Sequence, residues 1–211
     1  MIKHVHYNQI AGQSLERLAA LSDGVFAVAM TLLVLDLRTP AVSLIHGDQD
    51  LIHALLGLAP SFAVYFLSFL TLGIFWVGQQ TQLEQLRQSD RNMSWIHIGF
   101  LCAVTLVPFS TSLVAGFIIL RAALIVYWLN ILLLGAILFA SWHYALCGGL
   151  LREDVPAETS AWVKRRIVIA QLLYGFGAAL CVFNTYWSLC FIVLVQLNYA
   201  IAPRLFGLSK I

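Results

Sequence analysis

Long runs without a charged side chain are the main feature of the pattern along this chain. Four such runs cover residues 51–83, 92–120, 122–151 and 167–203. Each exceeds the roughly 20 apolar residues that a helix needs to cross the hydrocarbon core of a bilayer. The last run is long enough for two helices with a turn at Asn184–Tyr186, and another apolar segment extends from about Leu18 to Leu37.

The pattern predicts an all-α integral membrane protein with one transmembrane domain, residues 1–211, and six membrane-spanning helices. The expected spans cover about residues 15–37, 52–78, 93–115, 119–147, 161–183 and 186–205. Pro60 and Pro108 should bend the second and third spans, because proline removes a backbone donor. The apolar runs are continuous rather than alternating, which is not typical of a membrane β-barrel.

Composition excludes the other broad classes of protein. Apolar residues make up 61% of the chain and charged residues 10%, against roughly a quarter charged in soluble domains. Disordered chains are poor in apolar residues and rich in charge. The net charge of +2 gives no reason to expect a nucleic-acid partner, so the expected surroundings are membrane lipids.

The basic residues predict an orientation in the membrane. If the N-terminus is inside, ten of the twelve Lys and Arg residues lie on the inner side. Only Arg38 and Arg121 then lie outside. Basic residues concentrate on the cytoplasmic side of membrane proteins, so we expect both termini in the cytoplasm. The run Lys164–Arg166 should anchor at the inner lipid surface.

The first apolar segment contains an intramembrane carboxylate. Asp23 lies four to five residues into the segment, which is about 8 Å along a helix. Arg17 is six positions away and therefore on another face. Each side chain is expected to contact another helix or another subunit. Asp23 is interpreted either as part of a polar contact that fixes helix packing or as a group with a direct ion or proton role.

A seam of residues at heptad spacing follows the same segment. Its members are Leu21, Gly24, Val28, Thr31 and Leu35, and such spacing favours contact with one neighbour or one axis. Asp36 follows at the expected outer end. Repeated by symmetry, it would form an acidic ring that concentrates cations.

Enzyme and metal-site motifs are not found in the sequence. It contains no P-loop, no GxSxG and no HExxH, so we expect no catalytic residues. His143 and Cys147 share a helix face, but a metal site needs three or four ligands. No metal site and no cofactor are expected.

Three segments resemble one family of membrane proteins. Residues Arg17–Gly24, RLAALSDG, resemble the RxxxFSDG signature of the transmembrane protein 175 family of cation channels. Residues Leu106–Thr111, LVPFST, are similar to its proline–phenylalanine motif. Residues Phe75–Gln79, FWVGQ, lie where the family has a tryptophan followed three places on by histidine. The match covers about the first 115 residues.

The sequence departs from the family pattern at three positions. Leu21 replaces the motif phenylalanine, Gln79 replaces the histidine of the second helix, and His97 stands where the third helix often has asparagine. A histidine is therefore expected on a neighbouring helix, and proton sensitivity is not carried over with the motif.

The resemblance implies a prokaryotic plasma-membrane potassium channel assembled as a homotetramer. The first helices of four subunits would line a central pore that conducts K+ passively through an apolar constriction. Carried over by position, the constriction consists of Val28, then Thr31 or Leu32, then Leu35, with Asp36 at the outer mouth. An apolar ring of this kind can also close by dewetting.

The resemblance also implies a polar network at the inner end of the first helix. Arg17, Ser22 and Asp23 would pin this helix to its neighbours. Gly24 would allow close helix approach. The expected partners on the second and third helices are Trp76, Gln79 and His97.

Three alternatives remain at this stage. A small secondary transporter usually shows internal repeats and paired broken helices, and no repeat is found. A membrane enzyme would need clustered acids, histidines or a nucleophile, and only Asp23 with His97 comes close. A proton-conducting variant of the channel is the third alternative.

Overall fold

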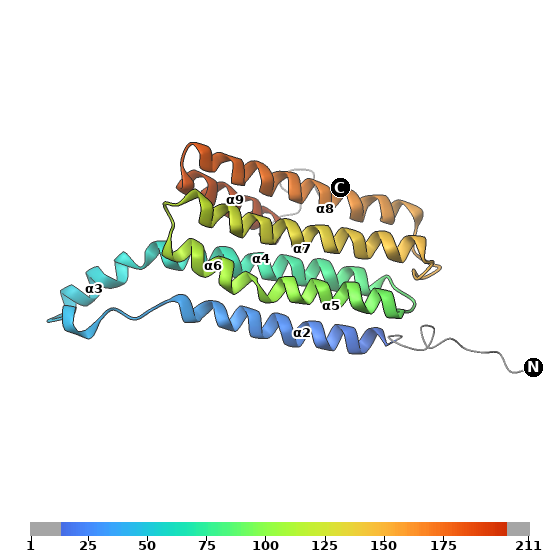
Figure 1. Ribbon diagram of the computed structural model, residues 1–211, viewed down its shortest axis with the longest axis horizontal. Coiled ribbons are helices and arrows are strands. Elements are labelled where there is room, and N and C mark those ends of the chain that lie inside the picture. The colour runs from blue at the N-terminus through green and yellow to red at the C-terminus, as the bar shows by residue number, and fades with distance from the viewer. Residues whose placement is uncertain (1–13, 202–211) are drawn as a thin grey trace, which may run out of the picture.

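The apolar runs form helices in the computed structural model, which describes residues 14–201. The α-helices are α2 (Leu15–Leu32), α3 (Asp48–Gly57), α4 (Ala59–Glu84), α5 (Arg91–Thr105), α6 (Val107–Gly116), α7 (Arg121–Cys147), α8 (Ala157–Ala179) and α9 (Thr185–Ile201). Short 3-10 turns cover Leu33–Asp36, Val42–Leu44 and Leu180–Val182. Most of these helices run along the long axis of the molecule, and α3 projects obliquely from one end (Figure 1).

Five helical segments are long and apolar enough to cross a membrane. They cover Leu15–Asp36, Ala59–Glu84, Arg91–Gly116, Arg121–Cys147 and Glu158–Val182. The sixth segment, Thr185–Ala200, is apolar but shorter, and residues 202–205 of the expected span lie outside the described residues. The chain is therefore an all-helical integral membrane protein with five clear candidate spans, and the count of six stays a prediction.

The second expected span differs from the sequence prediction. Residues 48–57 form the separate helix α3, and α4 begins only at Ala59, with Pro60 in its first turn. Proline lacks a backbone N–H, which the first turn of a helix does not need. Pro60 therefore starts a new helix, and the expected bend lies at the junction of the short helix α3 with α4 (Figure 1). At its other end α4 continues to Glu84, beyond the expected residue 78.

Pro108 has the same effect in the third span. Helix α5 ends at Thr105, Leu106 caps it, and α6 begins at Val107 with Pro108 in its first turn. The two helices remain in line (Figure 1). The expected bend is thus a break between two helices that together form one span.

Helix α7 occupies the middle of the bundle, and α2 lies at its edge. Helix α7 packs against α5, α6 and α8, and Leu124, Tyr127, Ile131 and Leu134 of α7 are fully buried. Helix α2 contacts mainly α4 and α5. One side of α2 consequently has no packing partner among residues 14–201.

Buried hydroxyls and amides form a network in the core. The Tyr127 hydroxyl lies 2.8 Å from the Thr71 hydroxyl and accepts a hydrogen bond from Ser68 at 3.3 Å. Thr111 donates to Ser68, and the Gln196 amide donates to Thr71. Polar side chains inside a membrane bundle hold helices together by such bonds, which in this chain join α4, α6, α7 and α9.

Two turns lock together at the end of the bundle where α2 begins. The Arg87 N–H donates to the Leu150 carbonyl at 2.9 Å, and the Arg152 N–H donates to the Gln85 carbonyl at 3.0 Å. Gly149, with φ of +62°, closes the end of α7 in the left-handed conformation that glycine adopts most readily. These bonds join the α4–α5 turn to the α7–α8 turn.

Candidate pore-lining helix and its polar anchor

Helix α2 has two distinct sides. One side packs into the bundle through Leu18, Ser22, Phe26 and Ala29, and Leu33 continues it in the 3-10 turn. The other side carries the seam of residues found in the sequence, of which Leu21 is 48% exposed, Val28 58% and Leu35 71%. Leu32, which lies beside the seam, is 44% exposed. Among the residues that the structure describes, this mainly apolar face from Leu21 to Leu35 therefore has no packing partner.

The middle of the exposed face offers no free polar group. The Thr31 hydroxyl donates to the Val28 carbonyl at 2.8 Å within the same helix. Thr31 thus presents mainly its methyl group, and its hydroxyl is already satisfied. Both Thr31 and Leu32 are exposed. Asp36 lies at the end of the 3-10 turn and is half-buried.

A groove runs beside this face between α2 and α5. It has a volume of about 420 Å³ and is lined by Ala20, Leu21, Gly24, Val25, Val28, Ala29, Leu32 and Thr105. Apart from the backbone of α2 itself, no atom among residues 14–201 would lie within 4 Å of a Cβ added at Gly24. The close helix approach expected at Gly24 is therefore not made among the described residues.

The buried side of α2 is anchored by Ser22. The Ser22 hydroxyl donates to the Leu18 carbonyl at 2.9 Å and lies 2.6 Å from Nε2 of His97. The Gln79 amide nitrogen donates to the same hydroxyl at 3.2 Å. In the contact between Ser22 and Nε2 of His97, the tautomer of the ring decides which of the two groups donates. Three helices meet at this one hydroxyl.

Asp23 belongs to a second and more exposed cluster. Its Oδ1 atom accepts hydrogen bonds from Nε1 of Trp76 at 2.8 Å and from Nε2 of Gln80 at 2.7 Å. Both donors are neutral and both lie on α4, four positions apart. Sequence reasoning missed Gln80, although the spacing from Trp76 puts the two side chains on one helix face.

The single polar network expected from the sequence is therefore two clusters. Ser22, Gln79 and His97 form the buried one, and Asp23 and Trp76 belong to the exposed one. Arg17 joins neither cluster. Its backbone N–H is capped by Ser14, and its guanidinium is exposed with no hydrogen-bond or ion-pair partner among residues 14–201.

The remaining polar candidates form no ligand set. Sγ of Cys147 lies 3.8 Å from Nε2 of His143, and Nζ of Lys164 lies 3.4 Å from Nδ1 of the same ring. No group of three or more His, Cys, Asp or Glu side chains suited to a metal occurs in the part of the chain that the structure describes.

These features define a class: a helical membrane protein with an apolar helix face left open at the edge of the bundle. Comparison with known proteins specifies the family. Residues 17–108 match the family model described as endosomal/lysosomal potassium channel TMEM175. A potassium channel of Streptomyces collinus is 32% identical over 170 residues, which cover 78% of this chain and 81% of that protein. The chain belongs to the TMEM175 family, a family of ion channels and not of enzymes.

Two further similarities cover different lengths of the chain. The crystal structure of a lysosomal potassium-selective channel TMEM175 homologue from Chamaesiphon minutus matches with a TM-score of 0.78 and 25% identity, over 90% of this chain and 98% of that one. A zebrafish relative, named endosomal/lysosomal proton channel TMEM175, is 34% identical over 105 residues. That match covers 47% of this chain but only 20% of the relative.

Proposed function

We propose that this chain is one subunit of a homotetrameric, potassium-selective channel in a prokaryotic plasma membrane, with both termini in the cytoplasm. The observation that carries the proposal is the exposed apolar face of α2. Val28 and Leu35 are among its most exposed residues, at 58% and 71%. Four copies related by a central axis would bury this face around a pore.

The constriction would consist of stacked apolar rings. Val28 forms the first ring, Thr31 or Leu32 the second, and Leu35 the third. An apolar ring cannot replace the water around an ion, so an ion passes with part of its shell. Potassium holds water less tightly than sodium, and each 1.4 kcal/mol of difference in that cost changes relative permeation about tenfold. A modest potassium preference therefore needs no ring of carbonyl groups.

Asp36 would act at the outer mouth. It follows the last apolar ring by one residue, and no titratable side chain lies between Val28 and Leu35. Four copies of this carboxylate would raise the local concentration of cations before they enter the apolar neck.

The two polar clusters would hold α2 in place and not contact the ion. Ser22 joins the buried side of α2 to α4 and α5 through Gln79 and His97. Asp23, the next residue of α2, joins the helix to α4 through Trp76. Arg17 has no partner within the described chain, so it is available to a neighbouring subunit or to lipid phosphate.

Proton conduction is the second candidate function, favoured by the name of the zebrafish relative. A proton crossing an apolar neck without titratable groups would need a continuous chain of water. Such a current would persist when potassium and sodium are replaced by large impermeant cations, and it would follow the pH gradient.

The test is electrical. Purified protein in planar bilayers is placed between potassium on one side and sodium on the other, at equal pH. Potassium selectivity predicts a current that reverses towards the potassium equilibrium potential. In a second recording, with large impermeant cations on both sides and a pH gradient across the bilayer, a current that reverses at the proton equilibrium potential would support the second candidate. Solute-driven flux without passive current would instead indicate a transporter.

A further inference from the structure

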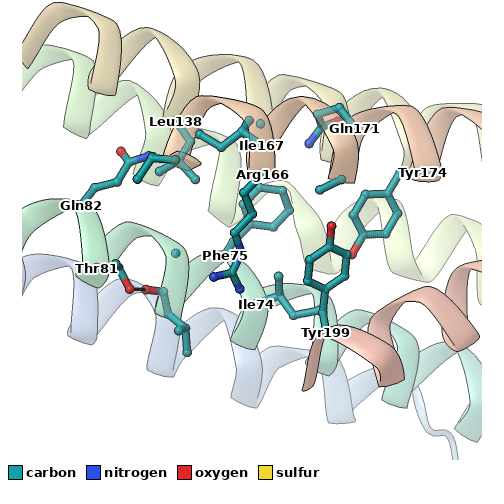
Figure 2. Close-up of a pocket in the computed structure, with 15 residues that line it drawn as sticks. Ile74, Phe75, Thr81, Gln82, Leu138, Arg166, Ile167, Gln171, Tyr174 and Tyr199 are labelled. Atoms are coloured by element: carbon teal, nitrogen blue, oxygen red, sulfur yellow. Dashed lines mark hydrogen bonds between the residues drawn. The ribbon is translucent and has the colours of Figure 1, made fainter. Parts of the chain in front are cut away.

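A cavity between α4, α7, α8 and α9 is separate from the proposed pore (Figure 2). It has a volume of about 110 Å³. It continues into an apolar groove of about 390 Å³ between α4 and α9. Arg166 and Tyr199 line both spaces, together with Ile74 and Val77. The cavity and the groove therefore meet at one arginine.

The guanidinium of Arg166 has no anionic partner. It lies 5.8 Å from the ring centroid of Tyr199, and neither salt bridge found among residues 14–201 involves it. The two preceding basic residues point elsewhere: Lys164 faces His143, and Arg165 lies over Trp162. Only one charge of the basic run thus faces the cavity.

The position of Arg166 along the helix makes that charge costly. It lies nine residues after Ala157, the start of α8, or about 14 Å along the axis. Its neighbours Ile74 and Val77 precede Glu84, the end of α4, by two to three turns. Arg166 therefore lies within the candidate span Glu158–Val182 and not at its first residue, and an arginine in such a segment normally pairs with an anion or with polar groups.

A second observation points to a ligand in the same cavity. The hydroxyl of Tyr174 is buried, with the residue 2% exposed, and makes no hydrogen bond of standard geometry, although the Gln196 side chain lies close enough to interact with it. The Oε1 atom of Gln171 is likewise buried and unpaired. In Figure 2 the Tyr174 side chain points towards the Tyr199 ring, on the side of the cavity that Arg166 also lines. An unpaired donor and an unpaired cation therefore line one space.

We infer that this cavity binds the phosphate headgroup of an anionic phospholipid, with an acyl chain lying in the adjoining groove. The planar guanidinium of Arg166 suits a phosphate oxygen pair. The Tyr174 hydroxyl supplies a further donor. The groove beside it is lined by Phe69 and Leu70, which suit an acyl chain. Basic pockets between membrane helices recognise anionic headgroups by this combination.

Retention of lipid by the purified channel tests this site. Wild type, Arg166→Gln and Arg165→Gln are incubated with phosphatidylglycerol or phosphatidylcholine of the same acyl chains, and native mass spectrometry counts the bound lipids. Arg165→Gln is the matched control, since it removes the same charge one residue away. We expect the affinity for phosphatidylglycerol to fall about tenfold in Arg166→Gln, because one charge-assisted hydrogen bond is lost. Arg165→Gln should bind phosphatidylglycerol as well as the wild type does.

A second variant tests the site without removing a charge. Tyr174→Phe removes only the unpaired hydroxyl and should also weaken phosphatidylglycerol retention. Equal loss in both arginine variants, or equal retention of phosphatidylcholine, would overturn the proposal. Displacement of the lipid by millimolar inorganic phosphate would also overturn it, because it would indicate a site for a free anion. A disulfide formed between subunits by Leu70→Cys would overturn it too, because it would indicate that a second copy of the chain covers the groove.

Discussion

Val28 is the residue on which the proposed constriction most depends. It is more exposed than Leu21 or Leu32 on the same helix, and it is smaller than leucine. Val28→Ala should widen the ring, raise the unitary conductance and lower the potassium-to-sodium permeability ratio, because ions would pass with more of their water. Single-channel recording in mixed potassium and sodium solutions measures both quantities. Unchanged conductance and unchanged selectivity would remove Val28 from the constriction.

The middle ring can be assigned in the same way. Thr31 and Leu32 are both exposed, and Leu32 also lines the groove shared with Thr105 of α5. The residue that faces the axis should change conductance when truncated to alanine. The other should change oligomer stability instead. A pair of variants, Thr31→Ala and Leu32→Ala, measured by single-channel recording and by size-exclusion chromatography, therefore separates the two roles.

Asp23 should act on assembly and not on selectivity. Asp23→Ala removes the acceptor of Trp76 and Gln80, two hydrogen bonds to a charged group, each worth about 1.5–3 kcal/mol before allowance for solvent at this exposed site. We expect a smaller tetramer fraction and fewer open channels, with an unchanged reversal potential. Asp23→Asn keeps a carbonyl acceptor and is the matched control. A change confined to the permeability ratio would contradict the anchoring role.

At the scale of the element, Gly24 offers a test that separates the subunit from the assembly. Apart from the backbone of α2 itself, nothing in residues 14–201 lies within 4 Å of a Cβ added there, and glycine costs a helix interior about 0.8–1 kcal/mol relative to alanine. Gly24→Leu should therefore leave the folded subunit at least as stable, while blocking close approach of a second copy. Thermal melting of the monomer in detergent and cross-linking of the tetramer measure the two effects. An intact, conducting Gly24→Leu tetramer would place Gly24 away from the interface.

The positions of the helices were largely predictable, because charge-free runs of about 20 apolar residues or more favour membrane-spanning helices. The sequence did not predict that one helix ends at Gly57 and another begins at Ala59. Pro60 fits equally well as a kink within a helix and as the first turn of a new one, and the sequence does not distinguish them. Leu15–Leu32 followed expectation closely because Ser14 supplies a cap and an apolar seam follows it.

The sequence predicted most residues of the two polar clusters, but it did not predict Gln80, the absence of Arg17 or the division into two clusters. The pairing of Ser22 with Gln79 and of Asp23 with Gln80 depends on the rotation of α4 relative to α2, which local sequence does not determine. Two adjacent residues on α2 consequently reach different clusters on one facing helix. The sequence also did not predict that the Arg17 guanidinium has no partner among residues 14–201.

At the scale of the whole molecule, the buried network around Tyr127 should be structural. Tyr127→Phe leaves the hydroxyls of Ser68 and Thr71 short of a partner inside the bundle, at a cost of about 1–3 kcal/mol. We expect a lower melting temperature and an unchanged reversal potential. Tyr174→Phe is the control in lipid-free detergent, because its hydroxyl makes no hydrogen bond of standard geometry. If Tyr127→Phe changed the selectivity, this network would line an ion path and would not be purely structural.

The hydrogen-bond network around Tyr127 could not be predicted from the sequence, for a physical reason. Many Ser and Thr side chains in apolar runs bond only to their own helix, as Thr31 does. Those that meet across helices, such as Ser68 and Thr111, can be identified only when the register of packing is known. The same holds for the cavity at Arg166, whose walls come from four helices.

The central claim is that α2 lines the ion path, and thiol accessibility tests it most directly. Val28→Cys is made in a background with Cys102, Cys147, Cys181 and Cys190 replaced, and a cationic thiol reagent is applied during current recording. The control is Leu172→Cys, 68% exposed on α8. We predict that the current through Val28→Cys is blocked and that high potassium slows the block, while Leu172→Cys is unaffected. A Val28→Cys channel that conducts normally after complete modification would contradict a pore lined by α2.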